Sequence, residues 1–291
     1  MDASTLAALP RPGVVATALG AVRVVGVLVL LVVGTAVLLA AALVPGRPRG
    51  VRLAVHVAVG IARAFLALTG TRLAVEDAEA LRVHRGFVFF NHLAWLDSVA
   101  LMAVTPVRFL ATQGVRRIPF VGWMASAIGT LFVQRSRDES REAARVALRA
   151  AVAGSPLPVA LAPEGGIGPG PGVLPLRHGA FEVATDADAD VLLVALRFEP
   201  PGYAVWDREW LLAPLWRLCA RTSPFTVHVR ALTPVLETRP GGDAAADPEA
   251  LAAEATRRFN AALGHAPEPK GGRGSDSRAT RLAPSERPGS R

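Results

Sequence analysis

Asn91, His92 and Asp97 are the residues whose types and spacing could carry acid–base chemistry, and they come directly after the apolar run GFVFF that begins at Gly86. An imidazole takes up a proton near neutral pH, and a carboxylate bonded to one ring nitrogen leaves the other nitrogen free as a base. Five residues correspond to about 140° around one continuous helix, so the two side chains would not share a face. We therefore expect His92 in a turn and Asp97 in the first turns of the helix that follows.

The nucleophile for such a base should come from the substrate. The chain has no Gly-x-Ser-x-Gly elbow, and its one thiol, Cys219, lies in the apolar run LLAPLWRLCA, where a buried thiol is inert. A single cysteine also allows neither an intramolecular disulfide nor a multi-cysteine zinc site. The alternative interpretation of His92 is structural, in which the ring caps or pads the start of a helix.

Two further segments place polar residues at predicted strand ends. The segment GTLFVQR, Gly129 to Arg135, ends a strand with an arginine, and APEGGIGPGPG, from Ala162, follows a strand with a glutamate and a glycine-rich loop. No Gly-Lys-Ser/Thr follows the loop, so it is not a nucleotide-binding P-loop. Taken alone, it could be an ordinary surface loop.

At these places the chain resembles the 1-acyl-glycerol-3-phosphate acyltransferase family of glycerolipid acyltransferases. The matching motifs are Asn-His-x4-Asp at Asn91, His92 and Asp97, Gly-x-x-Phe-x-x-Arg at Gly129, Phe132 and Arg135, and Pro-Glu-Gly at Pro163, Glu164 and Gly165, followed by Pro175, Arg177, Gly179 and Ala180. A fourth motif, an apolar strand with a proline, is matched only weakly by Val191 to Leu196, which lacks the proline. The resemblance extends from about Thr71 to Thr233.

The resemblance implies an O-acyltransferase with His92 as the general base and Asp97 as its support. It implies an acyl donor, acyl-CoA or acyl carrier protein, with no further cofactor and no metal. The acceptor would be a lysophospholipid, foremost 1-acyl-glycerol-3-phosphate, giving phosphatidic acid. The residues implied to bind substrate are Asn91, Gly129, Phe132, Arg135, Glu164, Gly165, Gly166 and Arg177. For Glu164 we expect a bond to a hydroxyl or to Arg135, because its charge would repel phosphate.

Two departures from the family pattern leave the acceptor open. Gly166 stands where the family has threonine, and Gln113 stands where a basic residue is common, although Arg116 and Arg117 lie nearby. The same chemistry could therefore act on a lyso-aminolipid or a glycolipid, or could move acyl chains between lipids. A non-catalytic lipid-binding protein is the alternative outside enzymes.

From Thr71 onward, short apolar runs alternate with helical patterns, which predicts an α/β fold with a mixed, largely parallel sheet covered by helices. The predicted strands are 86–91, 107–111, 130–134, 157–162, 191–198 and 226–232. The predicted helices are 94–104, 119–128, 138–153, 178–184 and 248–263.

The N-terminal part predicts a membrane anchor. Val24 to Val44 carries no charge, and a helix of that length spans about 31 Å, close to the apolar thickness of a bilayer. A cleaved signal peptide and a buried soluble helix are the alternatives. Leu53 to Leu68 is shorter and contains His56 and Arg63, so it could lie in the interface or form a hairpin with the first helix. Arginines flank the anchor on both sides, with Arg11 and Arg23 before it and Arg47, Arg49 and Arg52 after it. The small excess after the anchor favours a catalytic domain on the cytoplasmic face of the cell membrane.

We therefore expect an anchor over residues 1–70, an acyltransferase domain over 71–265 and a disordered basic tail over 266–291. The net charge of +8 favours anionic partners, but much of it lies in this tail, which holds Lys270, the only lysine. The expected partners are the lipid bilayer, the lysophospholipid and the acyl donor. Nucleic acid is not expected, because no binding module is recognisable.

Overall fold

The structure, a computed structural model, describes residues 12–134, 138–153, 155–168, 172–204, 212–239 and 246–265. Arg135 and the tail predicted over 266–291 lie outside the described residues. The strands are β1 (Thr71–Glu76), β2 (Phe87–Phe90), β3 (Arg108–Thr112), β4 (Leu131–Val133), β5 (Val159–Leu161), β6 (Val191–Glu199) and β7 (Phe225–Leu236). The helices are α2 (Val14–Leu43), α3 (Leu53–Leu68), α4 (Ala78–Val83), α5 (Leu96–Val104), α6 (Gln113–Arg116), α7 (Val121–Ala127), α8 (Asp138–Val152), α9 (His178–Asp186), α10 (Leu212–Cys219) and α11 (Pro248–Ala262), with a 3-10 turn, η1, at Pro48–Gly50.

The described strands form one sheet in the order β1-β7-β6-β2-β5-β3-β4. Neighbouring strands are parallel except β6 and β7, which are antiparallel. The strands β2, β3, β4, β5 and β6 therefore all end at the same edge of the sheet. In open α/β sheets this carboxyl edge is where ligands bind. The predicted fold class, a mixed and largely parallel sheet, is confirmed.

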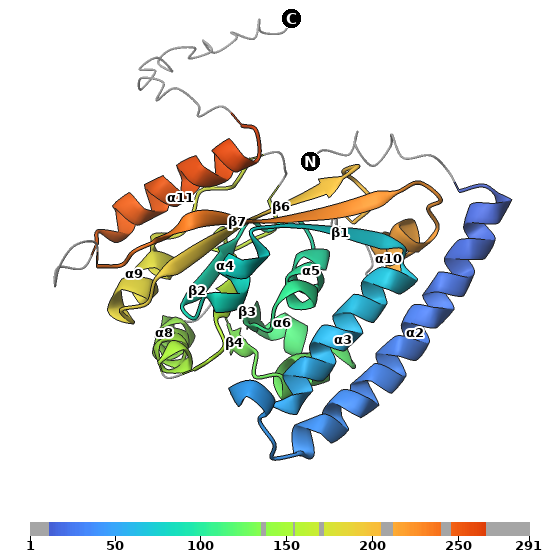
Figure 1. The fold of residues 1–291 in the computed structure, drawn as a ribbon, viewed down its shortest axis with the longest axis horizontal. Coiled ribbons are helices and arrows are strands. Elements are labelled where there is room, and N and C mark those ends of the chain that lie inside the picture. Colours follow the sequence, from blue (N-terminus) through green and yellow to red (C-terminus); the bar gives the residue numbers. More distant parts are fainter. Residues whose placement is uncertain are drawn as a thin grey trace, which may run out of the picture.

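Helices cover both faces of the sheet (Figure 1), and the alternation along β2 shows why. Phe87 and Phe89 point into the core formed with α8, α9 and α11, whereas Val88 and Phe90 point into the core formed with α3 and α5. All four side chains are buried. A strand that is apolar on both faces needs a helical layer on each side, which is what the continuous apolar run GFVFF predicts.

The helices α2 and α3 form an antiparallel hairpin along one side of the molecule (Figure 1). Only α3 packs extensively into the core, with Ala54, Val55 and Leu66 buried, while much of α2 remains exposed. The observed α2 is longer than the predicted apolar segment, because it begins at Val14. It is the one helix of the described residues that is long and apolar enough to cross a bilayer, judged by length and composition alone.

The sequence prediction missed β1, α4, α6 and α10. The strand β1, TRLAVE, is an edge strand with exposed Arg72 and Glu76, so it lacks the apolar run of the inner strands. The helices α4 and α6 are too short for a helical period to show. The helix predicted over 248–263 is α11, which Pro248 opens directly after Asp247, whose side chain accepts the N–H groups of Glu249 and Ala250.

Candidate active site

The side-chain amide of Asn91 fixes the start of the turn after β2. Its side-chain nitrogen donates to the carbonyl of Leu196 at 3.0 Å, and its side-chain oxygen accepts the N–H of Leu196 at 2.7 Å. The amide therefore continues the pairing of β2 with β6 by one more residue, at the point where the main chain turns away. Because both ends of this buried amide are used, Asn91 acts on the shape of the turn, and the expected contact with substrate remains a prediction.

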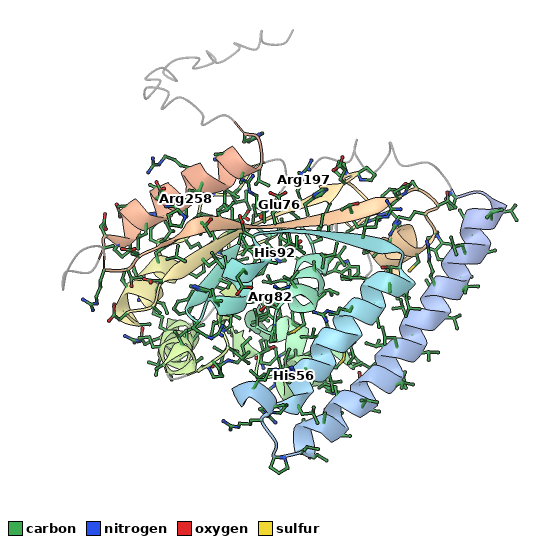
Figure 2. All side chains as sticks on the ribbon, in the orientation of Figure 1. His56, Glu76, Arg82, His92, Arg197 and Arg258 are labelled. Atoms are coloured by element: carbon green, nitrogen blue, oxygen red, sulfur yellow. The ribbon has the colours of Figure 1, made fainter. Side chains whose placement is uncertain are left out.

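His92 and Asp97 meet as the spacing predicts. His92 lies in the turn and Asp97 in the first turn of α5, and Nδ1 of His92 is 2.8 Å from Oδ2 of Asp97. With Asp97 ionised, Nδ1–H donates to the carboxylate, which leaves Nε2 of the ring with a free lone pair. The imidazole is 25% exposed while Asp97 is fully buried, so the base can be reached from outside and its support cannot. Figure 2 shows His92 beside α5, well separated from His56 on α3.

One oxygen of Asp97 accepts hydrogen bonds from three N–H groups. Besides the His92 ring, Oδ2 accepts the backbone N–H groups of Leu93 at 2.7 Å and Ala94 at 2.9 Å. The other oxygen, Oδ1, is buried and accepts no hydrogen bond from the described residues. Burial raises the pKa of Asp97, and the bonds from His92 and the backbone partly oppose this rise. The carboxylate thus costs solvation energy and orients both the imidazole and the turn.

Glu164 fixes the main chain of the same turn. Its Oε1 accepts the N–H of His92 at 2.8 Å, and its Oε2 accepts the N–H of Leu174 at 2.9 Å. The carbonyl of His92 in turn accepts the N–H of Gly168 at 2.7 Å. The glycine-rich loop is therefore hydrogen-bonded to both the N–H and the carbonyl of His92. Burial raises the pKa of Glu164, with the backbone donors acting in the opposite direction.

These backbone partners of Glu164 were not among those expected from the sequence. We expected an acceptor hydroxyl or Arg135, and Arg135 lies outside the described residues. The signal that could have suggested the main chain is the glycine at 168, where a Cβ would lie 2.7 Å from Oε2 of Glu164.

Gly165 and Arg177 lie against each other. Gly165 has a φ of +73°, and a Cβ there would lie 2.2 Å from Nε of Arg177. No larger residue fits without moving the arginine, which explains the glycine physically. The N–H of Gly165 donates to the carbonyl of Ala162 within the loop, so the expected role of Gly165 in binding substrate stays a prediction. Gly166 has open space where a side chain would project, so a threonine would fit there.

The second motif lies along β4. Gly129 has a φ of +85° and forms the turn between α7 and β4, so it has a backbone role, and its expected part in substrate binding stays a prediction. The ring of Phe132 lies 5.7 Å from the guanidinium carbon of Arg116. Phe132, Arg116 and Gln113 line one hollow of about 330 Å³ between α6, β4 and α8. Arg116 therefore stands one helical turn after Gln113 and faces the same space.

The site thus divides into two parts. Hydrogen bonds join His92, Asp97 and Glu164 into one network. Asn91 holds the start of the same turn through Leu196, and Arg177 lies against Gly165 of the glycine-rich loop. Phe132 borders a separate hollow by β4, whose carboxyl end lies at the same sheet edge, and Gly129 precedes that strand. Within the described residues no group of three or more His, Cys, Asp or Glu side chains could hold a metal ion.

Comparison with known proteins agrees with this geometry. Residues 72–199 match the family model described as Acyltransferase. The chain is 38% identical over 109 residues to a 1-acyl-sn-glycerol-3-phosphate acyltransferase of Neisseria gonorrhoeae, covering 37% of this chain and 42% of the relative. It is 30% identical over 158 residues to a lyso-ornithine lipid O-acyltransferase of Rhodobacter capsulatus, covering 51% of this chain and 56% of the relative. The matches thus span only about half the length of these curated relatives.

A solved structure shares the fold. The crystal structure of the 1-acyl-sn-glycerophosphate acyltransferase from Thermotoga maritima superposes with a TM-score of 0.65, covering 86% of this chain and 97% of that one, at 16% identity. At this identity the likeness concerns the fold.

Proposed function

We propose a function for this chain on the basis of its family, the acyltransferases, to which residues 72–199 belong. The protein transfers an acyl chain from a thioester to the free hydroxyl of a lyso-lipid. The observation that carries the proposal is the 2.8 Å contact between His92 Nδ1 and the buried carboxylate of Asp97 at the carboxyl edge of the sheet. That contact leaves Nε2 of His92 as a base in an accessible position.

The reaction follows from this geometry. Nε2 of His92 takes the proton of the acceptor hydroxyl as its oxygen attacks the thioester carbonyl carbon. The C–O ester bond forms, the C–S bond breaks, and the imidazolium returns the proton to the departing thiolate. Asp97 stabilises the imidazolium between the two steps. Acyl-CoA or acyl carrier protein supplies the thioester, and the chemistry requires no further cofactor.

The acceptor carries a charged head, and arginines near the site are suited to bind it. Arg177 lies against the loop that holds His92, Arg116 faces the hollow beside β4, and Arg135 follows β4 in the sequence. A guanidinium binds phosphate through forked hydrogen bonds. These positions support 1-acyl-glycerol-3-phosphate as the acceptor and phosphatidic acid as the product.

A lyso-aminolipid is the second candidate acceptor. Relatives from Rhodobacter capsulatus and Pseudomonas aeruginosa are named lyso-ornithine lipid O-acyltransferases. Gly166 lacks the hydroxyl donor of the family's threonine, and the neutral Gln113 in the hollow replaces a basic residue, so both positions offer less to a phosphate. An ornithine head carries both signs of charge and needs fewer cations around it.

The hairpin supports action at a membrane. The exposed valines of α2 would lie in the apolar layer, and Arg47, Arg49 and Arg52 follow at its C-terminal end. This arrangement favours a catalytic domain on the cytoplasmic face, where acyl donors with soluble carriers are found. Lysolipid and product both remain in the bilayer beside the site.

An acceptor panel tests the proposal. Purified protein in mixed micelles receives one acyl-CoA together with 1-acyl-glycerol-3-phosphate, lyso-ornithine lipid or lysophosphatidylcholine, and both released thiol and diacyl product are measured. The proposal predicts product with at least one anionic or ornithine-bearing acceptor, and the ratio of kcat/KM values decides between the two. Absence of thiol release with every acceptor, and again when acyl carrier protein replaces acyl-CoA as the donor, would support the non-catalytic alternative.

A further inference from the structure

A second cavity lies where the N-terminal end of α2 meets α10 and the start of β7. It measures about 170 Å³, and its lining includes Gly13, Ala16, Tyr203, Trp216, Arg221 and Ser223. None of these residues belongs to the network around His92. Figure 1 shows α10 beside the N-terminal half of α2, on the side of the molecule formed by the helical hairpin.

Two arginines, Arg217 and Arg221, line this cavity, and Arg221 is buried, with 4% of its surface exposed. Its terminal nitrogens donate to the carbonyls of Ser223 at 2.9 Å and Thr69 at 2.8 Å, and to the hydroxyl of Thr71 at 3.2 Å. Its Nε is buried without a hydrogen-bond partner. Burial lowers the pKa of Arg221 to about 10, so the guanidinium remains charged at neutral pH. Its hydrogen-bond partners among the described residues are neutral, and its guanidinium carbon also lies 5.0 Å from the centre of the Phe225 ring.

A further arginine adds to this positive charge. Arg23 of α2 donates through one nitrogen to the carbonyls of Cys219 at 3.0 Å and Arg221 at 2.8 Å. Within the described residues no carboxylate pairs with Arg23 or Arg221. The thiol of Cys219 cannot supply a negative charge, because burial raises its pKa to about 11. Two neighbouring arginines that have no carboxylate partner among the described residues favour the binding of an anion beside them.

The N-terminal end of α2 adds further positive charge at this cavity. Gly13 caps the helix without a side-chain hydrogen bond, and the first turn holds no acidic residue. The first N–H groups of a helix lack partners within it, and its dipole places partial positive charge there. Helix N-termini of this kind bind phosphate and other anions.

We propose that this cavity binds a phosphate group, either on the head of a membrane phospholipid or as free phosphate. Arg221 and the first turn of α2 supply the positive charge, and Ser223 and Tyr203 supply hydroxyls. The setting fits a lipid head, because α2 has the length and composition of a membrane-crossing helix and begins at this cavity. Tyr203 and Trp216 are the residue types that gather at the level of lipid headgroups.

A carboxylate placed in the cavity should replace the anion. Ser223→Asp puts a negative charge beside Arg221, whereas Ser223→Asn introduces a side chain of the same size with no charge. Both variants lose the 3.1 Å contact between the hydroxyls of Ser223 and Tyr203 equally. The exposed Thr222, which also lines the cavity, provides a second pair, Thr222→Asp and Thr222→Asn, should position 223 disturb folding.

Thermal unfolding with inorganic phosphate gives the first readout, with chloride at matched ionic strength as the reference. The measurement uses the full chain carrying Arg135→Ala, so that phosphate bound at the proposed acceptor site does not contribute. Phosphate should raise Tm by about 2–4 °C in this background and in the Asn variants, and the Asp variants should lose that shift. Without phosphate, the Asp variants should unfold at a higher temperature than the Asn variants.

Vesicle flotation identifies the source of the phosphate. If the ligand is a lipid head, the Asp variants bind phosphatidylglycerol vesicles about tenfold more weakly than the Asn variants, while binding to phosphatidylcholine vesicles is weak and equal. If the ligand is free phosphate, only the Tm shift separates the variants. Equal behaviour of the Asp and Asn variants in both measurements overturns the site, whether or not the protein proves to be an acyltransferase.

Discussion

At the scale of single residues, the carboxyl of Asp97 supports catalysis but lowers the stability of the fold when it is ionised. It orients His92 through Nδ1, and its own burial raises its pKa. A carboxyl with a higher pKa in the folded than in the unfolded state stabilises the fold below its unfolded pKa of about 3.9. That contribution is lost as the pH rises through the folded pKa. The ionised form that supports catalysis is therefore the less stable one.

Asp97→Asn should separate these effects. Because the amide of this variant cannot ionise, its free energy of unfolding relative to wild type should rise from about pH 4 towards pH 7, with a slope of at most about 1.4 kcal/mol per pH unit. The kcat should fall by about 10²–10⁴-fold, since an amide supports an imidazolium poorly. Urea unfolding between pH 4.5 and 7.5 measures the first effect, with the exposed Asp77→Asn as control. A stability difference that falls with pH would contradict the raised pKa.

Glu164 should act on rate rather than on acceptor affinity. Both of its oxygens accept main-chain N–H groups, so Glu164→Gln turns one acceptor into a donor that faces another donor. The peptide of His92 then loses its position, and kcat should fall by about 10–100-fold with little change in the acceptor KM. Steady-state kinetics beside the exposed Glu76→Gln variant provides the measurement. A rise in acceptor KM at constant kcat would instead place Glu164 on the acceptor hydroxyl.

The sequence predicts local contacts of this site better than distant ones. The contact between His92 and Asp97 depends on five residues of chain and one turn, so the spacing indicated it. The partner of Asn91 is Leu196, which lies 105 positions away, and the loop from Glu164 must fold back to bring Leu174 to the same carboxylate. Such contacts depend on the order of strands in the sheet, which the spacing of motifs does not specify.

At the scale of elements, glycines set how closely the hairpin packs. A Cβ on Gly20 of α2 would lie 2.8 Å from both the Cα and the Cβ of Ala220, immediately after α10. By contrast, a Cβ on Gly60 of α3 would meet nothing within 4 Å. Gly20 therefore allows α2 to approach Ala220 closely, whereas Gly60 has no packing role in the structure.

The matched pair Gly20→Ala and Gly60→Ala should move stability in opposite directions. Gly20→Ala forces α2 away from Ala220 and should cost about 1–3 kcal/mol. Gly60→Ala should stabilise by about 0.5–1 kcal/mol, because alanine favours the helix. Thermal unfolding of both variants in the same detergent tests the pair. Equal stabilisation by the two alanines would show that α2 does not pack on this surface.

The elements with long, regular patterns were predicted well from sequence. The charged and apolar residues of α8 and α11 repeat at the helical period, and the apolar runs of β2 and β6 indicate inner strands. The ends of elements were less predictable, since α2 begins ten residues before the uncharged segment and continues through Arg23. That arginine is accommodated by carbonyls of the segment after α10, a tertiary contact that hydropathy does not register.

At the scale of the whole molecule, the hairpin places an apolar surface on one side of a catalytic sheet. Val25, Val29 and Val32 of α2 are 60%, 56% and 53% exposed, an arrangement that favours contact with lipid. The acceptor hydroxyl of a lysolipid would then reach His92 without leaving the bilayer. The carboxyl edge of the sheet and the apolar hairpin act together in this arrangement.

Replacing these three valines by serine should reduce partition into vesicles by more than about tenfold, because each valine contributes apolar burial. The fold should survive, since the three side chains are exposed. Flotation with liposomes measures the partition, and the control replaces the exposed Val83 and Val146, which lie on α4 and α8. Unchanged partition of the triple variant, or an equal loss in the control, would exclude α2 as the membrane contact.

The most direct test of the proposed chemistry is acyl transfer by purified His92→Ala protein, with acyl-CoA and the acceptor that the wild-type protein prefers. His56→Ala, which removes an imidazole far from the site, is the control (Figure 2). If Nε2 of His92 takes the hydroxyl proton, His92→Ala should lose at least about 10²-fold in kcat and keep its circular dichroism spectrum, while His56→Ala stays near wild type. Wild-type turnover by a folded His92→Ala protein would contradict the assignment of His92 as the base.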